Sequence, residues 1–139
     1  MTSDVLLAKL GSIRRCIERI RSVTHGEPAS VHQIDVQEIV VLNLQRAVQS
    51  ALDLAAHVIS GRDWGLPDSL KQHFTVLEQQ GVLDAGLAGR LRAMTGFRNI
   101  AVHNYQTLDA AILERIVADH LGDLEEFAAA VTRLESPQG

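Results

Sequence analysis

The chain has 139 residues, a length typical of a single domain, and its hydrophobic (46%) and charged (22%) fractions are ordinary for a soluble globular protein. Only 4% of the residues are aromatic, so aliphatic side chains and alanine must build the core, which favours helices over sheets. The net charge of −4 at first argues against a nucleic-acid-binding protein, but seven acidic residues follow residue 104 and eleven of the thirteen basic residues are arginine, which binds phosphate well.

Several function classes have no support in the sequence. No apolar run approaches the roughly 20 residues that span a bilayer, and the first ten residues lack the basic start of a secretion signal. Cys16 is the single cysteine, and neither an HExxH run nor a Gly-rich phosphate loop occurs. We therefore expect a cytoplasmic protein that has no contact with a membrane, holds no metal or cofactor, and does not itself bind ATP strongly.

The first predicted helix runs from about Ser3 to Val23. Its apolar side chains recur at steps of three and four, the period of an α-helix: Leu6, Leu10, Ile13, Ile17 and Ile20. Gly26 and Pro28 end the pattern.

The second predicted helix is long and begins near Asp35. Asp35 and Glu38 resemble a capping box with Asp35 as the cap, and Gly61 ends the helix. The core stripe comprises Val41, Leu44, Val48, Ala51, Ala55 and Val58. Such a helix is roughly 40 Å long and is expected to span the domain or to form part of an interface.

A connector with Trp64 leads to a short third helix, which is predicted to begin at Asp68 or Ser69 and to end at Gly81, with Phe74 directed inward. The fourth helix is predicted from Asp84 to about Asn104. The fifth begins at Thr107 and carries the apolar side chains Ile112, Ile116, Leu121, Leu124, Phe127, Val131 and Leu134. With short connections and no strand-like alternation, we expect an all-α, antiparallel bundle of about five helices, forming one domain over residues 1–139.

The fourth helix places an arginine on a line of buried side chains. The core positions Leu87, Leu91 and Met94 continue by the same steps to Arg98, and then to Ala101 and Tyr105. A buried charge without a partner is costly, so Arg98 should be paired, face a cleft or face another subunit. A second apolar line, formed by Ala93, Phe97 and Ile100, suggests contact on two sides, one of which suits a dimer partner.

His103 lies five residues after Arg98, about 140° around an ideal helix, so the two side chains do not share a face. They converge if the helix distorts near its end, or if two subunits pack across this helix and complete each other's site. We favour the second arrangement, because it also explains the two apolar lines. Asn99 lies on the face of His103.

The run RNIAVHNY, from Arg98 to Tyr105, resembles the signature Arg-x4-His-x-Tyr of HepT-type toxins, a family within the HEPN-domain ribonucleases. A second Arg-x4-His pair, Arg115 and His120, reads as ordinary helix. The resemblance covers about residues 35–115 and is weakest at residues 24–34. It includes, in the order of the family, NLQRAVQSALDLAAHVIS, VLEQQGVLD and LAGRLRAMTGFRNIAVHNY.

This resemblance implies a HEPN-like helical bundle that dimerises, with the Arg-x4-His segments of both subunits lining a cleft. It implies a toxin that cuts RNA without metal and is paired with an MntA-type nucleotidyltransferase antitoxin. The antitoxin is expected to transfer AMP from ATP to Tyr105.

The residue types suit this chemistry. A neutral imidazole with a pKa near 6.5 can accept the proton of the RNA 2′-OH, so His103 is the candidate base or acid, and Arg98 can neutralise charge growing on phosphate oxygens. The expected products are a 2′,3′-cyclic phosphate and a 5′-OH. Asn99 is expected to orient the imidazole or the phosphate, and Tyr105 to stack on a base. AMP on Tyr105 would add bulk and negative charge where RNA phosphate must bind.

Other interpretations stay open. The chain can be a catalytically silent helical partner that binds the nucleotidyltransferase and presents Tyr105, or a plain structural bundle. Asp53 and His57 are four residues apart and can form a same-face pair or reach the cleft, although we expect them to be structural. The remaining histidines, His25, His32, His73 and His120, show no pattern that indicates a partner.

Overall fold

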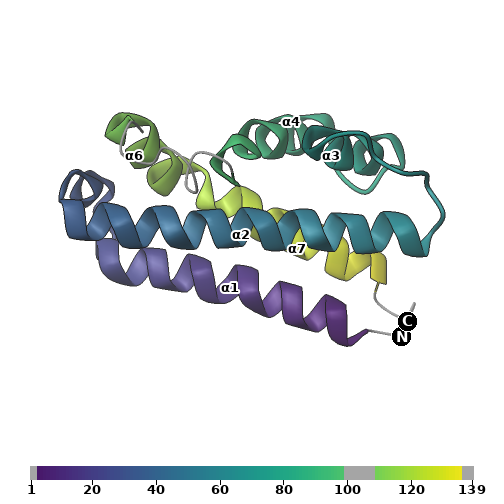
Figure 1. Ribbon diagram of the computed structural model, residues 1–139, viewed down its shortest axis with the longest axis horizontal. Coiled ribbons are helices and arrows are strands. Elements are labelled where there is room, and N and C mark those ends of the chain that lie inside the picture. The colour runs from purple at the N-terminus through teal and green to yellow at the C-terminus, as the bar shows by residue number, and fades with distance from the viewer. Residues whose placement is uncertain (1–2, 99–108, 136–139) are drawn as a thin grey trace.

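The computed structural model describes residues 3–98 and 109–135, and in this part of the chain all regular structure is helical (Figure 1). The elements are α1 (Asp4–Thr24), the 3-10 helix η1 (Pro28–His32), α2 (Ile34–Gly61), α3 (Leu70–Gln79), α4 (Ala85–Met94), α6 (Ala110–Asp119) and α7 (Leu121–Glu135). The predicted all-α fold class is confirmed.

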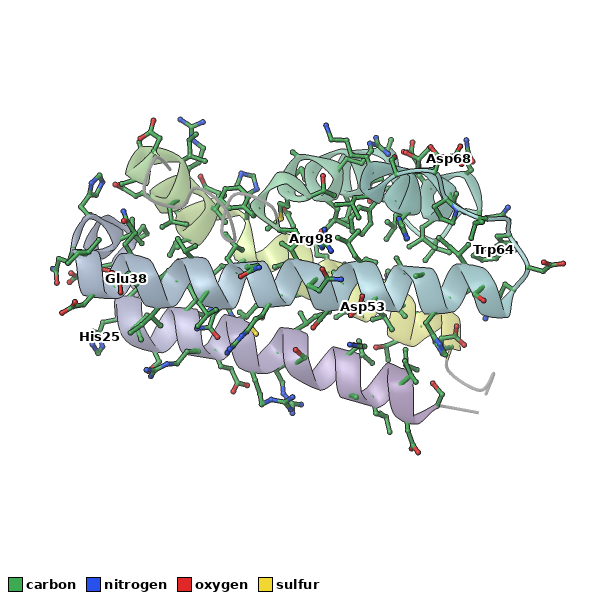
Figure 2. All side chains as sticks on the ribbon, viewed as in Figure 1. His25, Glu38, Asp53, Trp64, Asp68 and Arg98 are labelled. Atoms are coloured by element: carbon green, nitrogen blue, oxygen red, sulfur yellow. The ribbon has the colours of Figure 1, made fainter. Side chains whose placement is uncertain are left out.

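The long helix α2 is the axis around which the other helices pack. Figure 1 shows α1 running back along α2 over most of its length, while α3 and α4 cover one half of α2 and α6 lies over the other. α7 packs against α1, α2 and α4 and so closes the bundle. This arrangement places Arg98, which follows α4 closely in the chain, over the middle of α2 (Figure 2).

The predicted boundaries of α1 are confirmed. Ser3 caps the helix, because its Oγ accepts a hydrogen bond from the Leu6 amide at 3.0 Å. His25 and Gly26 end it with left-handed φ values of 51° and 74°. The predicted stripe is buried except for Leu10, which is half-buried.

The predicted capping box of α2 is wrong. The helix begins at Ile34, with Gln33 at the cap position and no capping side-chain bond there. Asp35 therefore lies inside the first turn, where its charge interacts favourably with the helix dipole. Every residue of the predicted core stripe is at most 4% exposed, so the helical face was correctly predicted.

Ser69 rather than Asp68 caps α3, with its Oγ accepting from the Gln72 amide at 3.2 Å. Phe74 points inward as predicted and meets Phe127 of α7 edge to face, with ring centroids 5.7 Å apart. Gly81 follows with a φ of 78°, which favours glycine.

The fourth helix is not continuous to the predicted end. α4 stops at Met94, because the Thr95 side chain donates to the Arg92 carbonyl at 2.8 Å and Gly96 follows. Residues 96–98 are again helical, and Asn99–Asn104 of the predicted helix lie outside the described residues. The line of side chains extrapolated from Met94 to Arg98 therefore crosses an interruption.

The predicted fifth helix is two helices. His120 has a non-helical φ of −122° and ψ of −1°, which separates α6 from α7. Asp109 caps α6 by accepting from the Ala111 amide at 2.9 Å, and Thr107 lies outside the described residues. Ile112, one of the apolar side chains of the predicted fifth helix, is 45% exposed.

None of the helices in the described part of the chain combines the length and the hydropathy needed to cross a lipid bilayer.

Candidate functional site

Arg98 lies just beyond the interruption of α4, where its amide donates to the Thr95 carbonyl at 3.2 Å. Its half-buried side chain lies over the middle of α2, as Figure 2 shows, and its Nε–H donates to the Gln49 carboxamide oxygen. Of the three environments expected for this arginine, pairing within the subunit is therefore observed.

The other predicted site residues, Asn99, His103 and Tyr105, lie outside the described residues. Their roles, including catalysis by His103 and modification of Tyr105, stay predictions. Of the signature, the structure describes only the first residue, Arg98.

A polar series extends from Gln49 to α1. The Gln49 Nε2 amide donates to Asp53 Oδ1 at 2.7 Å, and Lys9 of α1 donates to Asp53 Oδ2 at 2.9 Å. Gln49 and Asp53 are one helical turn apart on α2, so their side chains share a face. We call Lys9, Asp53, Gln49 and Arg98 the polar relay.

Sequence reasoning missed two members of the relay, Lys9 and Gln49. The four-residue spacing of Gln49 and Asp53 was visible, but the approach of Lys9 and Arg98 depends on tertiary packing. The suggested pair of Asp53 and His57 is not what the structure shows, since Asp53 binds Lys9 and Gln49. His57 lies instead beside Ser3, with its Nε2 atom 3.2 Å from Ser3 Oγ.

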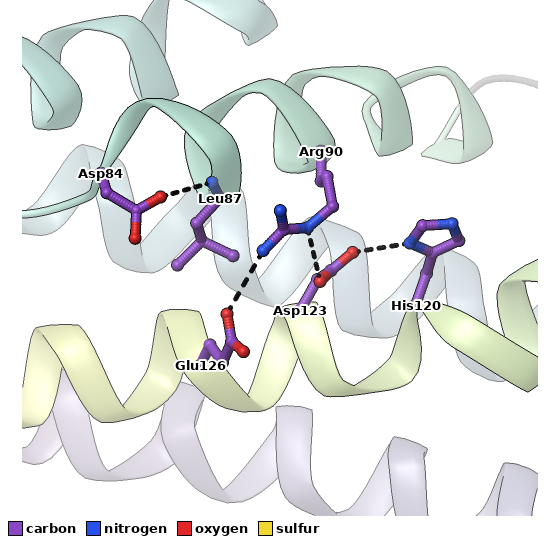
Figure 3. Close-up of polar contacts among 6 residues, drawn as sticks. All are labelled: Asp84, Leu87, Arg90, His120, Asp123 and Glu126. Atoms are coloured by element: carbon purple, nitrogen blue, oxygen red, sulfur yellow. Dashed lines mark hydrogen bonds and ion pairs between the residues drawn. The ribbon is translucent and has the colours of Figure 1, made fainter.

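Two ion pairs hold α4, and thereby the approach to Arg98, against its neighbours. Arg92 binds Glu78 of α3 at 2.8 Å. On the other side, Arg90 donates from Nε to Asp123 of α7 at 2.9 Å, and this bond raises the pKa of the Arg90 guanidinium (Figure 3). Fixed at both sides, α4 gives the segment after Met94 a defined starting direction.

Asp123 is also a partner of His120, whose Nδ1 atom lies 2.8 Å from Asp123 Oδ2 (Figure 3). The Asp123 side chain is only 8% exposed, so a buried carboxylate serves both partners at the junction of α6 and α7. His32 has a partner as well, Glu114 at 2.8 Å. The contact of His120 with Asp123 depends on the turn between α6 and α7, and that of His32 with Glu114 depends on tertiary packing. The sequence pattern indicated neither contact.

A mostly apolar hollow of about 210 Å³ lies between α4 and α6. Phe97 and Met94 line it together with Ile112 and Ile116, while Arg90, Arg115 and His120 contribute its polar groups. Phe97 is only 7% exposed, so the second apolar line of the predicted fourth helix is partly covered within the subunit. The hollow is smaller than the roughly 300 Å³ at which ligand pockets usually begin.

Metal and thiol chemistry find no support in the described residues. Over residues 3–98 and 109–135, no three histidine, cysteine or carboxylate side chains gather in a way that could hold a metal ion. Burial raises the pKa of the Cys16 thiol, which keeps it protonated near neutral pH and therefore a poor nucleophile.

Comparison with known proteins extends these observations. A family described as Ribonuclease HepT-like matches residues 13–131. The mRNA nuclease HepT of Shewanella oneidensis is 38% identical over 126 residues, covering 90% of this chain and 94% of that protein.

Two solved structures have the same fold. A toxin–antitoxin complex with AMP-PNP contains a chain 36% identical, with a TM-score of 0.88, and the match covers 94% of this chain and 99% of that one. The tri-AMPylated Shewanella oneidensis HEPN toxin in complex with MNT antitoxin is also 36% identical, with a TM-score of 0.87 and coverage of 95% and 99%.

The bundle around α2 is therefore a HEPN-like fold, with the arginine of an Arg-x4-His-x-Tyr segment held against its long helix. Within that class, the chain belongs to the HepT-like ribonuclease family.

Proposed function

We propose that this chain is a metal-independent endoribonuclease and the toxin of a toxin–antitoxin pair. The observation that carries the proposal is its 38% identity, over nearly the full length of both chains, to a protein named mRNA nuclease HepT. The half-buried guanidinium of Arg98, at the start of the signature, supports it, because guanidinium groups bind phosphate through two parallel hydrogen bonds.

The proposed reaction uses the nucleophile that RNA itself carries. His103 accepts the proton of the 2′-OH, and the 2′-oxygen attacks the adjacent phosphorus. Arg98 stabilises the negative charge that grows on the phosphorus oxygens. The bond from phosphorus to the 5′-oxygen breaks, and this oxygen takes up a proton, which gives a 2′,3′-cyclic phosphate and a 5′-OH. Asn99 orients the imidazole or the phosphate, and Tyr105 stacks on a base.

A homodimer completes the proposed site. On a regular helix Arg98 and His103 point about 140° apart, so convergence requires a distorted helix or a second subunit. Two copies that pack their signature segments together line one cleft with both pairs of side chains. The second histidine then has a position from which it can protonate the leaving 5′-oxygen, while the first acts as base.

The proposed partner is an MntA-type nucleotidyltransferase, which transfers AMP from ATP to Tyr105. Two structural relatives support this partner: one is a HEPN toxin crystallised in AMPylated form with an MNT antitoxin, and the other a toxin–antitoxin complex with AMP-PNP. AMP on Tyr105 places a negative phosphate and a bulky nucleoside two residues from His103. RNA would then be excluded by charge and by volume.

The test is cleavage of a fluorescent single-stranded RNA by purified protein in EDTA, comparing wild type with His103→Ala. We expect wild type to cut and His103→Ala to lose at least about 100-fold in rate, as is typical for loss of a general base. Size-exclusion chromatography with light scattering should find both proteins dimeric. Loss of activity with the dimer retained separates a catalytic role of His103 from a structural one.

The alternative, a catalytically silent partner of the nucleotidyltransferase, predicts another outcome. In that case unmodified wild-type protein leaves RNA intact, yet binds the nucleotidyltransferase and accepts AMP on Tyr105. Cleavage that stops on addition of EDTA would contradict the metal-independent mechanism.

A further inference from the structure

One partner of Arg98 is a neutral amide, and the contact with it therefore differs in charge from the contacts of other arginines in the described residues. Arg21, Arg90 and Arg92 donate to carboxylates, at 2.8, 2.9 and 2.8 Å. The bond from Arg98 goes to the carboxamide oxygen of Gln49. An amide oxygen fixes the plane of a guanidinium but adds no negative charge beside it, so this contact does not neutralise the cation that phosphate would meet.

The bond also engages one particular edge of the guanidinium. It is made by Nε–H, the donor nearest the aliphatic stem. Guanidinium groups bind phosphate through two parallel N–H bonds, and the pair Nη1 and Nη2 lies at the opposite end of the plane. A bond at Nε therefore sets the direction of this pair without drawing on it.

Asp53 determines which end of the Gln49 amide faces the arginine. Its Oδ1 atom accepts from Gln49 Nε2 at 2.7 Å, so the amide oxygen is turned toward Arg98. A carboxylate at the NH2 end also polarises the amide and strengthens its oxygen as an acceptor. Lys9 occupies the other carboxylate oxygen at 2.9 Å and balances its charge.

Stability alone is a weak reason for this arrangement. The side chains of Lys9 and Asp53 are 35% and 37% exposed, and ion pairs so accessible to solvent contribute little to the free energy of unfolding. The same contacts have a clear geometric effect, because they orient Gln49 from α1 through α2 toward the residue that opens the signature.

We propose that Gln49 is a positioning residue, which sets the orientation of the Arg98 guanidinium for phosphate, and that Asp53, held by Lys9, orients Gln49. The orientation of Arg98 by Gln49 is inferred from the contacts of the relay. The expected effect on RNA cleavage rests on the proposed ribonuclease function. The chemical class of ligand is the phosphodiester of single-stranded RNA.

The experiment compares Gln49→Met, Asp53→Ala and the control Glu125→Ala. Gln49→Met keeps the length of the side chain but removes both hydrogen bonds, and Asp53→Ala disturbs the relay without touching Arg98. Glu125 forms an ion pair with Arg21 at 2.8 Å, with side chains 48% and 51% exposed, so Glu125→Ala removes a paired carboxylate that lies outside the relay and outside the ion pairs of α4.

The first readout is the NMR signal of the Arg98 Nε–H group, assigned by its absence in Arg98→Lys. We expect slow solvent exchange in wild type, markedly faster exchange in Gln49→Met, a shifted signal in Asp53→Ala and no change in Glu125→Ala. An Arg98 signal that is the same in Gln49→Met as in wild type would overturn the proposal, whether or not the protein cuts RNA.

The second readout is cleavage of the fluorescent RNA in EDTA. We expect kcat to fall about 10- to 100-fold in Gln49→Met, as for a misplaced catalytic group, with a smaller fall in Asp53→Ala and no change in Glu125→Ala. KM should change less than kcat. If Arg98→Ala abolishes cleavage while Gln49→Met and Asp53→Ala cut at the wild-type rate, the positioning role is refuted and the ribonuclease function stands. If wild type leaves RNA intact, the ribonuclease function fails, and the NMR signal alone decides the geometric proposal.

Discussion

At the scale of the residue, the position of Arg98 follows from a conflict between burial and charge. The residues before it, Phe97 and Thr95, are buried, so the chain brings the arginine close to the core. Its guanidinium reaches a polar partner on α2 rather than bulk solvent. Because this side chain is already ordered, it loses less conformational entropy when a substrate binds. Such preorganisation favours stabilisation of the charge in a transition state.

The shape of the guanidinium should matter as much as its charge. Arg98→Lys keeps the positive charge but replaces the planar fork by a point charge on a flexible stem, which cannot reproduce both the contact to Gln49 and a bidentate grip on phosphate. We expect kcat for RNA cleavage to fall about 100-fold or more, as on removal of an oxyanion donor. Circular dichroism should be unchanged. Cleavage by Arg98→Lys at the wild-type rate would show that charge alone is sufficient.

The two proposed roles of Tyr105, stacking on a base and accepting AMP, depend on different parts of its side chain. Tyr105→Phe keeps an aromatic ring that can stack on a base but removes the hydroxyl that accepts AMP. We expect the variant to cut RNA within about threefold of wild type, because stacking uses the ring face common to both residues. Incubation with the nucleotidyltransferase and ATP should silence wild type and leave Tyr105→Phe active, and mass spectrometry should find no AMP on the variant. AMP found on the variant would place the modification elsewhere.

At the scale of the element, the attachment of α4 to its neighbours controls where the signature begins. The carboxylate of Asp123 connects α4 to the junction of α6 and α7, since it is shared by Arg90 and His120 (Figure 3). This junction divides the segment that was predicted as one long helix. Asp123 lies three residues after His120, the non-helical residue of the junction.

Asp123→Ala should therefore be costly in stability. The substitution leaves two partners without their shared acceptor at a site only 8% exposed, and we expect the free energy of unfolding to fall by about 1–3 kcal/mol in urea titrations. Glu126→Ala is the matched control, because Glu126 meets Arg90 only at 3.5 Å and is 61% exposed. Its effect should stay below about 0.5 kcal/mol. Equal effects of the two substitutions would argue against Asp123 as the anchor.

The pair Arg21 and Glu125, which joins α1 to α7, predicts a pH dependence. Two bonds of 2.8 Å from the Arg21 guanidinium lower the pKa of Glu125. A carboxylate with a lowered folded-state pKa contributes stability above its unfolded pKa of about 4.3, and this contribution is lost as pH falls through the folded value.

The difference in unfolding free energy between wild type and Glu125→Gln should thus be constant near neutral pH and shrink below about pH 4.3. Because both side chains are about half exposed, the difference should not exceed about 1 kcal/mol. Urea titrations from pH 3 to pH 7 would measure it. A difference that grows as the pH falls would contradict the assignment of this pair.

The elements also show what local sequence can and cannot predict. Periodicity identified the buried face of α2 and the inward direction of Phe74, because these depend on spacing along one helix. The predicted capping box at Asp35 was wrong, because η1 ends at His32 and α2 begins directly after it, which leaves Gln33 at the cap position. The interruption at Thr95 was missed because a single side-chain bond to the Arg92 carbonyl competes with an otherwise helical pattern.

At the scale of the whole molecule, the candidate site is only partly readable from the sequence. The signature motif indicated Arg98, and the alternatives for its environment included a partner within the subunit. The identity of that partner depends on the packing of α1, α2 and the segment after α4, which no local pattern specifies. Gln49 and Lys9 lie 49 and 89 residues from Arg98 in the chain, and tertiary packing brings the three residues into one series of contacts.

Four helices of the bundle contribute to the surroundings of Arg98, the first residue of the signature. α2 provides the surface, α1 supports it through the relay, and α3 and α7 fix α4 by ion pairs on both of its sides. The net charge of −4 is compatible with the proposed action on RNA, since a few ordered cations decide the local field.

Attack by the 2′-OH can be tested by end-group analysis of RNA cut in EDTA, with a matched substrate that carries a single 2′-deoxy nucleotide at the cleavage site. We expect a 2′,3′-cyclic phosphate and a 5′-OH from the all-RNA substrate, and no cut at that position in the 2′-deoxy substrate. Cleavage of the 2′-deoxy substrate, or a 5′-phosphate on the product, would contradict the attack by the 2′-OH on which the proposed roles of Arg98 and His103 depend.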